Sequence, residues 1–479
     1  MNKQLRRVSI VVLFMFLALF GSSTVITVFQ VDSLRADSRN VRTLYDSYSA
    51  ERGPILVDGD AVAESEPSDD QYKYQRVYTQ PELYSAITGY FTLNQGNSGV
   101  EGALNDYLSG TANSQFLDQV NAILTGQTPK GASVSLTIDP AVQQAAWDAF
   151  GDNTGAVVAI RPKTGEILAM ISKTAYDPNL LASHDTDQVI STYKGLIADP
   201  NRPLLNRAIG GDLYYPGSVF KLVVAAAALD SGKYTPDSEF PNPPQLQLPQ
   251  TSTFINNAEG GTCGGTPTVS IATALRLSCN IPFAQLGAAL GEDELEQYTT
   301  AFGYGSSFKV PMASTPSTFP KDLDQAQLML SSFGQYEDRV TPLQVAMTSA
   351  AIANGGTMMS PTLVKEITAP DLKVIKPFQE IAVGQPISQQ TAATLTQLMV
   401  ANVSNGAASN ARINGVEVAG KTGTAQNGDG RPYTLWFTGF APASDPEVAV
   451  AVVVENGKSF GNAVAAPIAK KVIEAVLNK

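Results

Sequence analysis

The feature of the sequence that most constrains the fold is a proline-glycine pair at 216–217 followed by a long apolar run. Proline and glycine end an extended segment, and the alanine-rich run at 222–230 predicts a buried helix that Gly232 stops. Ser218 then lies at or near a helix N-terminus, and Lys221 lies one turn away on the same face. Burial makes the proton of an ammonium easy to displace, so the neutral amine can act as a base. A serine beside such a base, in the positive field of a helix start, is an activated nucleophile.

Composition places the chain among ordinary globular proteins and excludes several partners and mechanisms. With 43% hydrophobic and 16% charged residues, the 479 residues are enough for about two to four domains. The net charge of −12 argues against a nucleic acid partner. A single histidine, His184, and two cysteines, Cys263 and Cys279, leave no plausible zinc site and little room for a Ser-His-Asp triad. His184 lies in a polar loop and is expected at the surface.

Residues 8–29 form an uncharged, strongly apolar run of membrane-spanning length. Basic residues precede the run and Asp32 follows it, so the positive-inside rule predicts a cytoplasmic N-terminus and an extracytoplasmic remainder. The alternative is a cleaved signal peptide, but the run is too long for a typical signal-peptide core and has no convincing small-residue cleavage site. We therefore predict a single-pass anchor in the cell membrane within residues 1–30.

The remainder of the chain divides into a non-catalytic module and a larger α+β domain. Residues 31–132 contain a short predicted strand at 55–57 but no chemistry, which predicts a spacer or docking module. From residue 133 a strand, a helix and a hairpin follow in turn, as at the start of a large α+β domain. The predicted elements of this domain, 133–479, are a helix at 141–150, hairpin strands at 156–160 and 166–171, strands at 433–440 and 447–454, and a helix at 462–477.

Three short motifs follow one another along the chain. They are Ser218…Lys221, Ser278…Asn280 and Lys421-Thr422-Gly423. Each motif alone is weak evidence, because the same patterns recur without the surrounding apolar helix or strands. These further matches are Ser191…Lys194, Ser306…Lys309 and Lys163-Thr164-Gly165. The ordered set is specific, and on it the chain resembles the penicillin-recognising acyltransferases, which comprise penicillin-binding proteins and serine β-lactamases.

The resemblance extends over nearly the whole chain. Arg52-Gly53-Pro54-Ile55 is similar to a motif in the N-terminal module of class B penicillin-binding proteins. Segments 137–143, 165–170 and 176–179 resemble the start of their transpeptidase domain. Phe333-Gly334-Gln335 fits a later segment, although Tyr336 stands where relatives more often carry glycine. The chain is most similar to the short actinobacterial penicillin-binding protein A type.

This resemblance implies an α+β fold with an N-terminal transmembrane helix, an elongated dimerisation or pedestal-like module at 31–132, and a transpeptidase domain at 133–479. In that domain an antiparallel sheet flanked by helices adjoins an all-helical region. The implied activity is that of a peptidoglycan D,D-transpeptidase of cell-wall synthesis, serving cell shape and cell division. It would cross-link stem peptides ending in D-Ala-D-Ala through a Ser218 acyl-enzyme, and β-lactams would acylate it.

The resemblance further implies a possible D,D-carboxypeptidase side activity and no metal or organic cofactor. Its implied partners are a SEDS-type glycan polymerase and other cell-wall synthesis proteins.

The resemblance also implies roles for the site residues. Ser218 is the acylated nucleophile, and Lys221 is the base that takes its proton. Ser278 relays a proton between the lysines and the leaving amine, and Asn280 fixes Lys221 and the substrate amide. Lys421 supplies positive charge to a substrate carboxylate.

The strand after Lys421 is expected to bind the substrate. The hydroxyls of Thr422 and Thr424 would meet the substrate carboxylate, and Gly423 would let the substrate backbone approach an edge strand closely. The oxyanion hole would consist of the backbone N–H groups of Ser218 and Thr424.

Cys263 and Cys279 are expected to form a disulfide, because two cysteines outside the cytoplasm are more often bridged than free and similar proteins share the pair. The alternative is two free thiols too far apart to react. Such a bridge would hold a glycine-rich loop against Ser278 and Asn280.

Two other functions are compatible with the motifs. A serine β-lactamase shares all three, but it needs a means of activating water against the acyl-enzyme that the sequence does not show. A non-catalytic β-lactam-binding sensor or scaffold is disfavoured by the intact Ser218–Lys221 pair.

Overall fold

The computed structural model of the chain describes residues 3–26, 30, 50–115, 130–258, 260–428 and 430–478. Among them, α1 (Lys3–Thr24) is the one helix long and apolar enough to cross a membrane. It covers most of the predicted run at 8–29. Residues 27–29, and residues 31–49 and 116–129 of the predicted module, lie outside the described residues.

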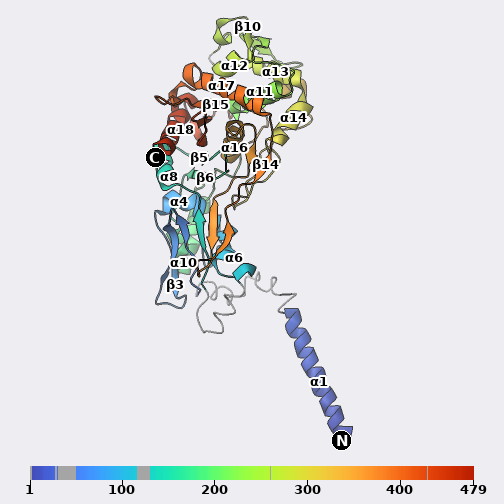
Figure 1. The fold of residues 1–479 in the computed structure, drawn as a ribbon, viewed down its shortest axis with the longest axis vertical. Helices are drawn as coiled ribbons and strands as arrows, with labels where there is room; N and C mark the ends of the chain where they lie inside the picture. The colour runs from blue at the N-terminus through green and yellow to red at the C-terminus, as the bar shows by residue number, and fades with distance from the viewer. Residues whose placement is uncertain are drawn as a thin grey trace.

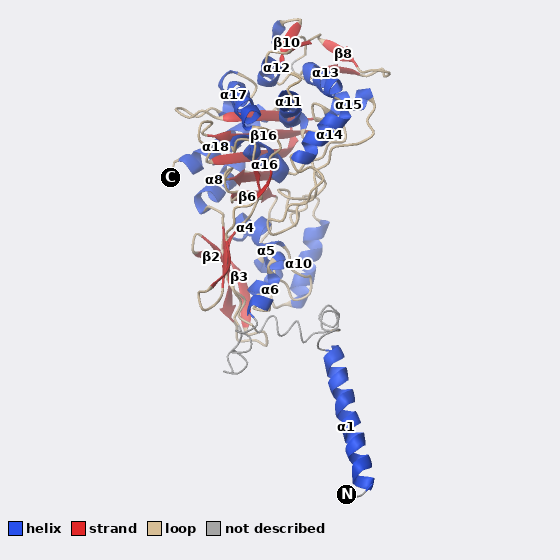
Figure 2. Cartoon of the chain, turned by 45° about the vertical axis from the view of Figure 1, so that its right-hand side comes forward, coloured by secondary structure: helices blue, strands red, loops and turns tan. Residues whose placement is uncertain are grey.

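In the described part of the chain, six strands form a sheet in the order β13-β12-β4-β1-β2-β3 (Figure 1). β4 runs parallel to β1 and antiparallel to β12, so the sheet combines strands from both sides of the predicted boundary at 132/133. Figure 2 shows α4, α5, α6 and α10 beside this sheet. The bounds are β1 Ile55–Val57, β2 Asp60–Pro67, β3 Tyr74–Tyr78, β4 Ser133–Leu136, β12 Val364–Thr368, β13 Val374–Pro377, α4 Pro81–Thr88, α5 Gly99–Ala103, α6 Asn105–Leu108 and α10 Thr186–Ala198.

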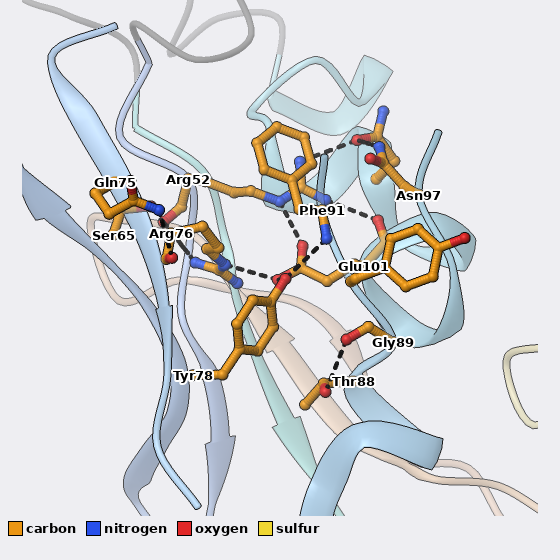
Figure 3. A network of polar contacts seen from close by, with 12 residues as sticks. Arg52, Ser65, Gln75, Arg76, Tyr78, Thr88, Gly89, Phe91, Asn97 and Glu101 are labelled. Atoms are coloured by element: carbon orange, nitrogen blue, oxygen red, sulfur yellow. Dashed lines mark hydrogen bonds and ion pairs between the residues drawn. The ribbon is translucent and has the colours of Figure 1, made fainter. Parts of the chain in front are cut away.

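A buried carboxylate, that of Glu101 in α5, ties this region together (Figure 3). Arg52 Nε donates to one of its oxygens at 2.5 Å, and Arg76 Nε in β3 donates to the other at 2.6 Å. The Tyr78 hydroxyl donates to Glu101 at 3.3 Å and accepts from the N–H of Phe91 at 2.9 Å. Buried charges are tolerated when they are paired, so the cluster fixes how three separate segments meet.

Five further strands of the described chain form an antiparallel sheet in the order β15-β16-β17-β5-β6. The predicted hairpin is confirmed as the β5–β6 pair, and the two later predicted strands as the β16–β17 pair. β15 is an edge strand, so one edge of its backbone faces away from the sheet. The bounds are β5 Gly155–Ile160, β6 Ile167–Lys173, β15 Ala419–Ala425, β16 Tyr433–Ala441 and β17 Val448–Gly457.

Helices cover both faces of this second sheet. α8 (Pro140–Phe150) and α18 (Gly461–Leu477) pack together on one face, and α16 (Pro342–Ala353) packs on the other (Figure 1). α8 begins at Pro140 because the Asp139 carboxylate caps the N–H groups of Ala141 and Val142. α16 is almost wholly buried and connects the sheet to the helical region.

The helical region lies at the end of the molecule beyond the second sheet (Figure 1). Its proline-rich connection carries short strands rather than a helix, as the prolines require. The predicted α+β fold is confirmed. The helices are α11 Lys221–Asp230, α12 Ile271–Leu277, α13 Ile281–Leu290, α14 Glu292–Ala301, α15 Gln325–Ser331 and α17 Gln389–Asn405.

Candidate active site

The candidate nucleophile lies in a single 3₁₀ turn, Gly217–Phe220, that leads directly into α11. Ser218 is half-buried, and Lys221 is the first residue of the α-helix. The predicted placement at a helix start is thus confirmed, with the difference that the first turn is 3₁₀. Among the described residues the Ser218 hydroxyl has no hydrogen bond. Its pairing with Lys221 is therefore inferred from their positions on either side of the junction between the 3₁₀ turn and α11.

Lys221 is completely buried, and two hydrogen-bond acceptors hold its side-chain nitrogen in place. Nζ donates to the backbone oxygen of Ser278 and to Oδ1 of Asn280, both at 2.8 Å. Burial, assisted by the positive charge of Lys421, lowers the pKa of Lys221 well below its ordinary value. Lys221 is therefore suited to act as a neutral base.

The loop that carries Ser278 and Asn280 connects α12 to α13. Ser278 ends α12 in a left-handed conformation, with φ of 62°, and Asn280 begins α13. The amide of Asn280 donates to the backbone oxygen of Asn256 at 2.9 Å, which turns its Oδ1 toward Lys221. The predicted disulfide is confirmed: Cys279, between these two residues, is bonded to Cys263.

Lys421 lies on the edge strand β15 and is also completely buried. Its Nζ donates to Oγ of Ser278 at 2.6 Å and to the backbone oxygen of Thr422 at 2.8 Å. Burial lowers the pKa of Lys421 to about 7. Ser278 thus stands between the two lysines, with its carbonyl on one and its hydroxyl on the other.

The two threonines that follow Lys421 have their hydroxyls engaged within the protein. The Thr422 hydroxyl donates to the backbone oxygen of Ala407 at 3.2 Å, so it can donate to a carboxylate only after that bond breaks. The Thr424 hydroxyl accepts from the N–H of Gly461 at 3.2 Å and keeps its own proton for donation.

Gly423 faces the nucleophile turn. A Cβ at this position would lie 3.1 Å from the backbone oxygen of Pro216 and 3.0 Å from Cβ of Trp436. The glycine therefore allows β15 to lie directly against the segment that presents Ser218.

Sequence reasoning missed residues that support this site from distant parts of the chain. Asn257 is buried, and its Oδ1 accepts hydrogen bonds from the N–H groups of Asn280 and Ile281 at 2.9 and 3.2 Å. It fixes the start of α13, yet an asparagine in a polar loop carries no local signal of this role.

The prediction that His184 lies at the surface is wrong. Only 12% of its side chain is exposed, because its loop packs against the N-terminal region, where Asp70 pairs with it and Tyr72 contacts its ring. The chance motif at 163–165 forms the β5–β6 turn, and Lys163 pairs with Asp445. It takes no part in the site.

The chain is similar to known proteins along most of its length. Residues 155–474 match the model of the penicillin binding protein transpeptidase domain, and residues 52–134 match that of the penicillin binding protein A dimerisation domain. The chain is 42% identical to the peptidoglycan D,D-transpeptidase PbpA of Mycolicibacterium smegmatis over 100% of both chains, and 41% identical to PbpA of Mycobacterium tuberculosis over 100% of this chain and 99% of the relative.

The structure is also similar to solved ones. The ceftriaxone acyl-enzyme complex of penicillin-binding protein A from M. tuberculosis superposes with a TM-score of 0.87 at 40% identity, covering 90% of this chain and 100% of the other. The penicillin G acyl-enzyme complex of that protein gives a TM-score of 0.85 at 40% identity, covering 89% and 100%. The chain therefore belongs to the penicillin-binding protein transpeptidases.

Proposed function

We propose that this chain cross-links peptidoglycan stem peptides through an ester on Ser218, with Lys221, Ser278 and Lys421 transferring protons and supplying charge. The observation that carries the proposal is the pair of hydrogen bonds made by Lys221. A neutral amine has two protons and one lone pair, and both protons are directed to acceptors, the oxygens of Ser278 and Asn280. The lone pair is then left to accept the proton of Ser218.

The first half-reaction forms an acyl-enzyme. Ser218 Oγ bonds to the carbonyl carbon of the penultimate D-Ala while its proton moves to Lys221. Collapse of the tetrahedral intermediate breaks the peptide bond, and the leaving nitrogen of the terminal D-Ala takes a proton through Ser278. Because the Ser278 hydroxyl accepts from Lys421, its own proton is available for this transfer, and Lys421 replaces that proton.

The second half-reaction reverses the proton path. An amine from a neighbouring stem attacks the ester carbonyl and passes a proton through Ser278 to Lys421. The ester C–O bond then breaks, and Ser218 recovers its proton from Lys221 as the new peptide bond forms. Water in place of the amine gives the D,D-carboxypeptidase reaction. Asn280 and the main chain of β15 orient the donor peptide, with Thr424 the better placed of the two threonines to donate to its carboxylate.

Lys421 supplies the charge that attracts the donor. The stem peptide and the β-lactams both carry a carboxylate, and a buried lysine with a pKa of about 7 binds an anion most strongly while it keeps its proton. Acylation of Ser218 by a β-lactam follows the same first half-reaction, with the amide bond of the lactam ring broken instead.

The first experiment is intact-mass measurement over time after penicillin is added to the solubilised full chain and to Ser218→Ala. A stoichiometric adduct that persists for hours and is absent from the variant is the expected result. An adduct that disappears within seconds would indicate a β-lactamase. The absence of an adduct on the unaltered chain would refute the catalytic function and favour a non-catalytic scaffold.

We further propose that α1 anchors the chain with its N-terminus in the cytoplasm and its catalytic domain outside, and that the anchor and the module at 31–132 bind a SEDS-type glycan polymerase. The basic residues in the first turns of α1, Lys3, Arg6 and Arg7, and the apolar composition of the rest of the helix support this orientation. Because β1 and β4 share a sheet, deletion of the module would also damage the domain at 133–479.

The partner test should therefore exchange residues 1–26 for an unrelated membrane span. Reduced co-purification of the polymerase is expected, and unchanged recovery would exclude α1 as part of the contact.

A further inference from the structure

Residues 333–340, which we call the bridging segment, run alongside the turn that presents Ser218. Tyr214 and Val340 exchange two backbone hydrogen bonds, of 3.1 and 2.9 Å. Further along, the N–H of Gly217 donates to the backbone oxygen of Gly334 at 3.0 Å. The approach is so close that a Cβ on Gly334 would lie 2.2 Å from the backbone oxygen of Gly217. The bridging segment therefore fixes the main chain immediately before the nucleophile.

The same segment also reaches the end of the edge strand. The side-chain amide of Gln335 donates from Nε2 to the backbone oxygen of Thr424 at 3.3 Å, and its Oε1 accepts from the N–H of Gln426 at 3.3 Å. One amide thus engages two peptide groups of the chain at the end of β15. It occupies the position that the backbone of a neighbouring strand would take at a sheet edge.

The orientation of the Thr424 peptide group follows from this contact. The N–H and C=O of one residue leave a β-strand on the same side. Because the oxygen of Thr424 is directed to Gln335, away from β16, the N–H of Thr424 is directed to that outer edge as well. This is the edge that faces Ser218, since Gly217 lies against Thr424 and Ala425.

We propose that Gln335 is a positioning residue for the oxyanion hole. It holds the N–H of Thr424 at a fixed separation from the N–H of Ser218, while its neighbour Gly334 holds the Ser218 turn. This inference rests on the proposed function, in which the carbonyl oxygen of donor peptide or β-lactam accepts from these two N–H groups. Gln335 itself touches no reacting atom; it acts through the main chain of Thr424.

Two replacements separate this role from simple filling of space. Gln335→Met keeps the length and apolar contacts of the side chain but removes both hydrogen bonds. Gln335→Glu keeps the acceptor for Gln426 but places a carboxylate against the oxygen of Thr424. Gln426→Ala is the matched control, because its exposed side chain is removed while its N–H remains.

The test resolves acylation by penicillin into a binding constant and an acylation rate constant. Loss of one oxyanion donor costs about 100- to 1,000-fold in rate, so displacement of a donor should cost about 10- to 100-fold. We expect this loss in the acylation rate constant, greater for Gln335→Glu than for Gln335→Met, with little change in binding and none for Gln426→Ala. The infrared band of the acyl-enzyme ester carbonyl should move to higher wavenumber in both variants, because its hydrogen bonds weaken.

An acylation rate constant within about twofold of the unaltered chain in Gln335→Met, or a reduced rate with an unmoved carbonyl band, would overturn the inference. If Ser218→Ala still forms an adduct, the proposed function itself fails. A folded chain that is labelled at Ser218 but insensitive to Gln335 leaves the proposed function intact and refutes only the positioning role. Should one variant not fold, the other still gives both readouts.

Discussion

Replacement of Asp338 by asparagine should stabilise the protein, and more at neutral than at acid pH. Asp338 lies in the bridging segment between Tyr336 and Val340, and none of its surface is exposed. Burial raises the pKa of its carboxyl from the ordinary 3.8 to about 8, because a carboxylate loses its hydration there. The charge of the neighbouring Arg339 acts in the opposite direction on this pKa but only weakly, and its guanidinium lies over the ring of Tyr215.

The magnitude follows from the linkage between proton uptake and folding. With a folded pKa above the unfolded one, this group contributes most to stability below about pH 4, and the contribution is lost as pH rises to about 8. Each pH unit within that window removes about 1.4 kcal/mol, so the full loss approaches about 6 kcal/mol. Between about pH 5 and about pH 7.5 the loss is about 3 kcal/mol. Asparagine has no proton to take up, so the variant lacks this dependence.

The assay is denaturant unfolding of the unaltered chain and of Asp338→Asn at these two pH values, with Asp237→Asn as the control at an exposed site. The difference in unfolding free energy between Asp338→Asn and the unaltered chain should increase by about 3 kcal/mol from the lower to the higher pH. The control should show no such increase. Parallel pH profiles for Asp338→Asn and the unaltered chain would show that Asp338 is ionised in the folded state and would refute the reasoning.

Three further predictions follow from the charges and the disulfide. Glu101→Gln should lower the unfolding free energy by about 3–5 kcal/mol, because Arg52 and Arg76 would remain buried without a counterion. Glu166→Gln is the control, because its ion pair is partly exposed, and an equal loss of unfolding free energy in that variant would contradict the prediction. The acylation rate at low penicillin concentration should fall as pH rises through about 7, since Lys421 then loses its charge; a level profile from about pH 6 to about 9 would argue against this role. Cys279→Ser should lower stability by about 3 kcal/mol and slow acylation, measured by unfolding and by adduct mass; an unchanged acylation rate would show that the loop at Ser278 keeps its geometry without the bridge.

Much of the site was predictable because its residues depend on local chemistry. A proline-glycine pair before an alanine-rich run places Ser218 and Lys221 at a helix start whatever surrounds them. The β5–β6 hairpin and the β16–β17 pair follow from short apolar runs on either side of turn residues, and both pairs are confirmed. The roles of the site residues stay predictions, although the structure brings Lys221, Ser278, Asn280 and Lys421 into direct hydrogen-bond contact.

What the sequence did not predict depends on contacts between distant residues. Asn257 and Gln335 are ordinary polar residues in loops until the fold places them beside Asn280 and Thr424. The engagement of the Thr422 hydroxyl by Ala407 depends on the loop after α17, which no motif in β15 indicates. The sequence predicts His184 at the surface because the packing of its loop on the N-terminal region has no local signal.

The contacts between the module and the domain are likewise not predictable from local sequence. The predicted boundary at 132/133 lies close to residue 134, where the match to the dimerisation domain ends. Backbone hydrogen bonds between β1 and β4 nevertheless cross this boundary. β4 lies between β1 and β12 in one sheet, and just after it the Thr137 hydroxyl contacts the oxygens of both Ile167 and Thr362. Displacement of β4 would therefore act on β6 of the five-stranded sheet. Among the described residues, a displacement of β1 would thus reach the transpeptidase domain through the backbone pairing of β1 with β4 and then through the Thr137 hydroxyl.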